Sequence, residues 1–145
     1  MSPLLFNLFI NDLAKYLKSL NIGVSFGDEK ICILLYADDI VLLAETANDL
    51  QVLLDALHDW YCTNDMNISS MKIYIVHFRP LSVPVTDVIC MCGDANLSVV
   101  NKYTYLGIVF TEHLDYNVSA KCVAQSASRA LGLLIAKLTR RRSTL

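Results

Sequence analysis

The chain has no apolar run long enough to cross a membrane. Its 145 residues are 54% hydrophobic, yet no apolar stretch reaches the ~18 residues that a membrane-spanning helix needs. The N-terminus also lacks a basic segment and a signal cleavage pattern, because Asn7, Asn11 and Asp12 interrupt its first apolar stretch. We therefore expect an intracellular protein, in the nucleus or the cytoplasm, that is neither secreted nor held by a membrane.

Paired cysteine and histidine motifs are missing as well. The five cysteines are odd in number and scattered, at Cys32, Cys62, Cys90, Cys92 and Cys122. The Cys90-Met91-Cys92 spacing is not the two-residue spacing of zinc sites, and no second pair completes a cluster. We expect reduced thiols and no zinc site.

The chain has little net charge, with a formal value of −2. Its clearest basic cluster is at the C-terminus, formed by Lys137, Arg140, Arg141 and Arg142. These side chains could contact phosphates. The simpler interpretation, a solvated helix end whose cations favour the C-terminal dipole, is preferred.

Two adjacent acids stand between two apolar runs, in the sequence Tyr36-Ala37-Asp38-Asp39. The runs, residues 31–35 and 40–44, predict two buried strands joined by a tight turn. Asp is a poor strand former, and an unpaired buried carboxylate costs free energy. Two carboxylates in such a place favour a site for hard divalent cations. The alternative is a solvated turn, since Asp is common in turns.

The remaining pattern mixes helices and antiparallel strands, which predicts an α+β fold. One helix should begin at Ser2-Pro3 and end before Asn21 and Gly23, and another should follow Thr46 as its N-cap and run to about Asn64. The last helix should begin near Tyr116 or Asn117, with apolar residues that can pack. Extended segments are expected at 24–28, 31–44, 73–78, 87–92, 97–100 and 103–110, the last as one strand with a bulge or a close backbone approach at Gly107.

Four segments in this order resemble reverse transcriptases of non-LTR (LINE-like) retrotransposons. They are Ser2 to Leu13, Tyr36 to Ile40, the stretch from Met66 to Phe78 that contains Lys72, and Tyr105-Leu106-Gly107. The last of these resembles the family's hairpin that grips the primer end. The resemblance implies a polymerase palm, in which an antiparallel sheet has helices packed on one face. It also implies RNA-directed DNA polymerase activity by two-metal nucleotidyl transfer, with an RNA template, a DNA primer and dNTPs as partners.

The resemblance also implies a role for each matching residue. Asp38 and Asp39 would be catalytic carboxylates that bind Mg²⁺ or Mn²⁺, and Lys72 would act near the pyrophosphate leaving group. The residues expected to contact primer or template are Ser2, Pro3, Tyr36, Ala37, Tyr105, Leu106 and Gly107.

The chain departs from the family pattern in ways that affect activity. The fingers and the first catalytic strand, which carries the family's other catalytic Asp, would precede Ser2 and are absent. Ser69 and Ile73 replace the usual Asn and Thr around Lys72. We therefore expect a single partial domain over 1–145, with palm motifs in 1–112 and a helical segment in 113–145. It should bind metal only with the missing upstream part of the polymerase and be inactive alone.

Several interpretations stay open. The chain could be an inactive fragment or decayed copy of a reverse transcriptase, or part of an incompletely defined active polymerase. It could instead be a domesticated palm-fold module that binds nucleic acid or protein without catalysis. The fourth interpretation is an unrelated α+β domain with a chance Asp-Asp turn.

Overall fold

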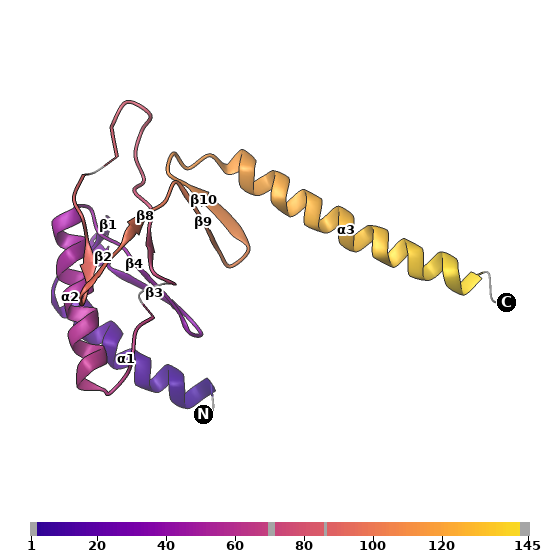
Figure 1. The fold of residues 1–145 in the computed structure, drawn as a ribbon. Coiled ribbons are helices and arrows are strands. Elements are labelled where there is room, and N and C mark those ends of the chain that lie inside the picture. Colours follow the sequence, from indigo (N-terminus) through magenta and orange to yellow (C-terminus); the bar gives the residue numbers. More distant parts are fainter. Residues whose placement is uncertain (1–2, 70–71, 86, 143–145) are drawn as a thin grey trace. The chain divides into compact units, whose positions relative to one another are not determined.

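The computed structural model describes residues 3–69, 72–85 and 87–142. The protein is α+β, with helices and short antiparallel strands in mixed order (Figure 1). It separates into two compact units, Met1–Ile73 with Thr86–Ser98, and Tyr74–Val85 with Val99–Leu145. The organisation as one domain, divided at residue 112, stays a prediction. No helix in the described ranges has both the length and the apolar character needed to span a membrane.

The first unit contains two long helices. Helix α1 (Pro3–Ser19) is followed by Asn21 in the left-handed region, with a φ of 54°. Helix α2 (Ala47–Thr63) begins after Thr46, whose hydroxyl accepts a 3.1 Å hydrogen bond from the Asp49 N–H. The predicted end of α1, the predicted bounds of α2 and the Thr46 N-cap are confirmed, whereas Ser2, at the expected start of α1, lies outside the described residues.

The core of this unit lies between the two helices and a strand, β3 (Ile33–Tyr36). Leu13 and Leu17 of α1 and Leu53 of α2 are completely buried. Beside them Phe9 packs on Trp60 with ring centroids 5.1 Å apart. Burying a leucine side chain contributes about 1.5–3 kcal/mol, so these residues fix α1 against α2.

Hairpins with two-residue turns are the recurrent strand unit of the described residues. In the first unit β1 (Val24–Phe26) pairs with β2 (Glu29–Ile31), β3 pairs with β4 (Asp39–Leu42), and β6 (Met91–Cys92) pairs with β7 (Ala95–Asn96). Each is a separate two-stranded ladder, so the described strands do not join into one continuous sheet.

The expectation that both strands of the Tyr36–Asp39 hairpin are buried was wrong in part. Ile33 is buried, but Leu34 is 43% exposed and Tyr36 is 60% exposed. Alternate residues of a strand point to opposite faces. Only one face of this hairpin packs on the helices, which explains the difference.

The second unit contains β9 (Lys102–Tyr105), β10 (Ile108–Thr111) and helix α3 (Tyr116–Arg142). A short strand, β5 (Tyr74–Ile75), pairs with β8 (Ser98–Val99), where the chain passes from the first unit into the second. Nearby, the guanidinium of Arg79 lies 2.8 Å from the carboxylate of Glu112. The expectation of one continuous strand over 103–110 was wrong, because Leu106 and Gly107 reverse the chain between β9 and β10. The hairpin that the resemblance implied at Tyr105-Leu106-Gly107 is confirmed as a turn.

Helix α3 begins where expected, after Asp115, whose carboxylate accepts a 3.0 Å hydrogen bond from the Asn117 N–H. Figure 1 shows it leaving the β9–β10 hairpin as an extended rod. Ser119 is buried, whereas Val123, Leu131 and Leu134 are more than half exposed. Among the helix residues whose side chains are described, the apolar ones expected to pack are exposed, and the side chain of Leu138 lies outside the described part.

Candidate functional site

The two candidate carboxylates lie at the tip of the β3–β4 hairpin. Tyr36 pairs with Asp39 in the register that closes the turn, which leaves Ala37 and Asp38 as the two loop residues. All four residues are exposed. The hairpin thus brings four of the predicted site residues into one turn, as the sequence implied.

The backbone of this turn is strained at Ala37, whose φ is 51°. Gly27 and Gly93 hold the same position in the β1–β2 and β6–β7 turns, with φ of 62° and 59°. A left-handed conformation costs an L-residue other than glycine roughly 1–2 kcal/mol. Such strain is concentrated at functional sites, so alanine here is a signal that the acids alone do not give.

A second hairpin turn of the same unit also contains two adjacent acids, so the acids alone are insufficient to identify a functional site. In the β1–β2 hairpin Phe26 pairs with Glu29 around Gly27 and Asp28. This turn therefore also has an aromatic residue, a small residue with positive φ and two adjacent acids. The β3–β4 tip differs from it in the strained alanine and in the pocket beside it.

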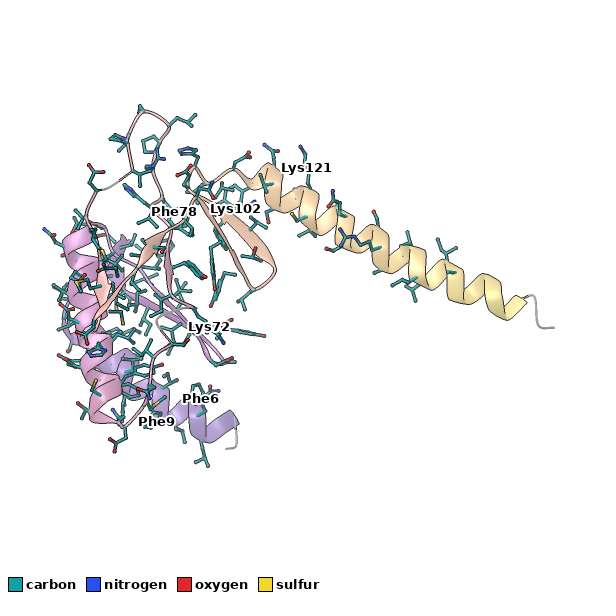
Figure 2. The ribbon with its side chains drawn as sticks, viewed as in Figure 1. Phe6, Phe9, Lys72, Phe78, Lys102 and Lys121 are labelled. Carbon is teal, nitrogen blue, oxygen red and sulfur yellow. The ribbon has the colours of Figure 1, made fainter. Side chains whose placement is uncertain are left out.

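That pocket has a volume of about 730 Å³ and lies between α1 and the β3–β4 tip. Its lining combines aromatic, apolar, amide and carboxylate groups, from Phe6, Asn7, Ile10, Asn11, Leu35, Tyr36, Ala37 and Asp38. Figure 2 shows Phe6 and Phe9 on successive turns of α1. The pocket is an open hollow with a mostly apolar lining and a few polar groups beside the two acids.

Asn7 and Asn11 are pocket residues that the sequence analysis missed. They are four positions apart on α1 and are therefore neighbours on the helix surface. The signal was available in the sequence, because two amides at this spacing interrupt an otherwise apolar segment. They were interpreted only as polar breaks that exclude a signal peptide.

The carboxylates of Asp38 and Asp39 fit a hard divalent cation in donor type, because Mg²⁺ prefers oxygen ligands. Among residues 3–69, 72–85 and 87–142, no group of three His, Cys, Asp or Glu side chains is arranged to hold a metal ion. The described chain therefore provides two adjacent donors and not a complete ligand set.

The other predicted site residues are distributed more widely. Lys72, which Figure 2 labels, belongs to the same unit and is exposed. Its backbone N–H donates to the Ser69 carbonyl at 3.0 Å. Pro3 begins α1, whereas Ser2 lies outside the described residues. Contacts of Lys72, Ser2 and Pro3 with nucleic acid stay predictions.

The Tyr105-Leu106-Gly107 segment forms the turn between β9 and β10 in the second unit. Leu106 has a φ of 50° and Gly107 a φ of 80°. Both central residues of a type I′ turn have positive φ, and the usual sequence there is Asn-Gly. An exposed leucine in this position is a second case of strain at a predicted site residue, although its contact with a primer stays a prediction.

Comparison with known proteins identifies the family to which the chain belongs. The sequence profile described as "Reverse transcriptase (RNA-dependent DNA polymerase)" matches residues 1–110. The chain is 32% identical over 118 residues to the Pol polyprotein of the type-2 retrotransposable element R2DM of Drosophila melanogaster, which covers 77% of this chain. R2 Pol polyproteins of Nasonia vitripennis and Popillia japonica are each 28% identical, over 78% and 85% of this chain.

These relatives are much longer proteins. The chain spans 11%, 12% and 19% of the Drosophila, Nasonia and Popillia polyproteins. No solved structure matches the chain significantly. With the profile match over residues 1–110, the chain belongs to the reverse transcriptase (RNA-dependent DNA polymerase) family of non-LTR retrotransposons.

Proposed function

We propose that this chain supplies the catalytic hairpin of an RNA-directed DNA polymerase with a palm-type site. The observation that carries the proposal is the strained Ala37 turn, which presents Asp38 and Asp39 beside a pocket of about 730 Å³. Membership of the reverse transcriptase family supports the same assignment. The substrates would be an RNA template, a DNA primer and a dNTP.

In this proposal Asp38 and Asp39 would hold Mg²⁺ or Mn²⁺. Bound divalent ions would supply charge stabilisation at the transferred phosphoryl group and activate the primer hydroxyl. The protein's own contribution is positioning, because paired strands below a two-residue turn restrict where the two carboxylates can move. Lys72 would provide positive charge near the leaving pyrophosphate, and Tyr36 would contact the primer-side nucleotide.

We further propose that the chain needs residues from the rest of a longer polymerase to be active. Two adjacent carboxylates repel each other, and the described residues place no third acid beside them. A two-metal site requires ligands that hold both ions roughly 4 Å apart. The isolated chain should therefore show no primer extension with Mg²⁺ or Mn²⁺, and incorporation that Asp38→Asn abolishes would disprove this.

The catalytic assignment is best tested in a complete polymerase. Residues 1–110 would replace the matching segment of the Drosophila R2DM polyprotein, and primer extension on an RNA template would be measured. Asp38→Asn or Asp39→Asn should lower the rate by about 10³-fold, since a lost metal ligand removes several kcal/mol of transition-state stabilisation. Asp28→Asn is the matched control from the other acidic tip and should leave the rate unchanged.

Metal-directed cleavage gives a second readout of the same assignment. Fe²⁺ bound in place of Mg²⁺ generates radicals that cut the backbone near the ion. In the chimera we expect cuts around residues 36–40 and not around residues 26–29. Equal cutting at both acidic tips, or none at residues 36–40 in a chimera that still binds primer–template, would contradict metal binding by Asp38 and Asp39.

A second candidate function is a binding module that keeps the fold without catalysis. The incomplete ligand set of the described residues favours it. It predicts that the 145-residue chain binds a primer–template in a salt-dependent manner without divalent ions, as phosphate contacts do. Binding unaffected by Asp38→Asn, together with a chimera that is folded but inactive, would favour this function over the first.

A further inference from the structure

A second pocket lies in the first unit, beside the C-terminal half of α2. Its volume is about 310 Å³, and its lining includes His58, Cys62, Cys92 and Gly93. Two thiols and an imidazole therefore face one cavity, although Cys62 and Cys92 are far apart in sequence. The proposed polymerase function uses none of these side chains.

The Gln51 side chain holds the backbone next to the second thiol, Cys92, in place. The Gln51 amide donates to the Met91 carbonyl at 3.0 Å, and the Met91 N–H donates to the Gln51 carbonyl oxygen at 2.8 Å. Strand β6 is thereby fixed along α2. Cys90 and Cys92, on either side of Met91, are both buried, at 2% and 5% exposure. Cys92 is the one of the two that lines the pocket.

His58 lies between Cys62 and the turn that follows Cys92. Its Nε2 lies 3.5 Å from the Sγ of Cys62, one helical turn further along α2. On its other side His58 packs against Gly93, where an added Cβ would lie 2.7 Å from His58 Cε1. The absence of a side chain at Gly93 thus leaves room for the imidazole between Cys62 and the β6–β7 turn.

The two thiols have different environments. Cys62 is exposed, whereas burial raises the pKa of the Cys92 thiol, as do the nearby Asp55 carboxylate and Cys62. The exposed Cys62 thiol is accessible to an oxidant in solution and lies beside an imidazole, a side chain that serves as a base for thiols in many proteins. Redox-sensor cysteines are solvent-accessible and often lie next to a second cysteine that resolves the first product.

We propose that Cys62 and Cys92 form a thiol-modification site that reacts with low-molecular-weight disulfides such as glutathione disulfide. His58 accepts the Cys62 proton, and the Cys62 thiolate attacks one sulfur of the oxidant. The oxidant's S–S bond breaks, a Cys62–glutathione bond forms, and the first glutathione leaves with a proton. Cys92 then attacks the Cys62 sulfur and releases the second glutathione. The two protein thiols are oxidised to one disulfide, and glutathione disulfide is reduced to two thiols.

The product would add a covalent link within the first unit. A Cys62–Cys92 disulfide joins the end of α2 to β6, which the Gln51 hydrogen bonds already hold together. It closes the intervening chain, which contains Lys72, into a covalent loop, and such a loop restricts the conformations of the unfolded chain. Oxidation would therefore stabilise the first unit.

The test uses the 145-residue chain in its folded form. It would be treated with glutathione disulfide and quenched at intervals, and the modified cysteines would be identified by mass spectrometry. Digestion before aspartates releases residues 59–64 with Cys62 and residues 87–93 with Cys90 and Cys92, which fragmentation distinguishes. Cys122 is the matched control, because it is also an exposed cysteine on a helix.

We expect Cys62 to be modified about ten-fold faster than Cys122 and then to appear linked to Cys92. His58→Gln should remove the rate advantage, and Cys92→Ser should leave Cys62 as a stable mixed disulfide with glutathione. Equal rates at Cys62 and Cys122 in the unmutated chain would overturn the proposal. So would a linkage of Cys62 to Cys90, or a mixed disulfide at Cys62 that never resolves.

Discussion

Ala37 and Gly27 hold equivalent positions in two hairpin turns of the same unit. Each is the first of two loop residues, each is followed by Asp, and their φ angles are 51° and 62°. The glycine adopts this conformation without a steric penalty, whereas the alanine does so against one. The two turns therefore differ in strain while sharing their geometry.

The first prediction concerns the exchange of alanine and glycine at these two positions. Ala37→Gly should stabilise the β3–β4 hairpin by about 1 kcal/mol, because it removes the left-handed penalty. Gly27→Ala should destabilise the β1–β2 hairpin by a similar amount, since no atom lies within 4 Å of the added Cβ and only the backbone cost remains. Amide exchange of each hairpin measures both effects, and a destabilising Ala37→Gly would show that the turn is not strained.

The second prediction concerns the β9–β10 turn. Leu106→Asn should stabilise this hairpin by about 1 kcal/mol, because Asn tolerates positive φ and Asn-Gly is the preferred type I′ sequence. Gly107→Ala is the matching change at the next position, where φ is 80° and the space around an added Cβ is open. It should destabilise the hairpin. Amide exchange of Tyr105 and Ile108 would report both variants, and equal effects would contradict the assignment of strain to Leu106.

The third prediction is a pH dependence at Glu45. Its carboxylate accepts hydrogen bonds from the Ser25 N–H at 3.0 Å and the Ser25 hydroxyl at 2.9 Å, and these bonds lower the pKa of Glu45 below its ordinary 4.5. A lowered pKa in the folded state means that the stabilisation is complete above the unfolded-state value. It is lost as pH falls through the lower folded-state value.

Amide exchange of Ser25 would test this dependence. Protection of the Ser25 N–H should decrease below about pH 4.5 in the unmutated chain. Glu45→Gln should make protection independent of pH in that range, because an amide cannot titrate. A pH profile that is unchanged in Glu45→Gln would assign the acid sensitivity to another group.

Local sequence signals predicted the parts of the fold that depend on local chemistry. The Thr46 cap, the helix end at Asn21 and the tip from Tyr36 to Asp39 follow from side chains that act on nearby backbone groups. Burial was harder to predict, because it depends on which surfaces meet. Leu34 and Leu131 are apolar, yet the structure leaves both exposed.

The candidate site was also only partly predictable from local sequence. The acids were visible in the sequence, but a positive φ at Ala37 and Leu106 is a property of the turn and not of the residue type. The pattern of the residues alone predicted a bulge or a close backbone approach at Gly107, because the glycine interrupts a strand-like run, and only the family resemblance indicated a hairpin there. Asn7 and Asn11 were visible in the sequence as two amides in an apolar segment, but their place in a pocket depends on the pairing of β3 with β4 and the packing of α1.

The last prediction concerns the junction of α3 with its hairpin. The Ser119 hydroxyl is buried and accepts a 3.3 Å hydrogen bond from the Val109 N–H of β10. Ser119→Ala should destabilise this junction by about 1–2 kcal/mol, because the half-buried N–H would lose its acceptor. Ser126→Ala is the control, since Ser126 is exposed on the same helix and donates only to the Cys122 carbonyl in its own helix. It should change stability by less than about 0.5 kcal/mol. Amide exchange of Val109 measures the difference, and equal protection in the two variants would show that the hydroxyl does not hold α3 to β10.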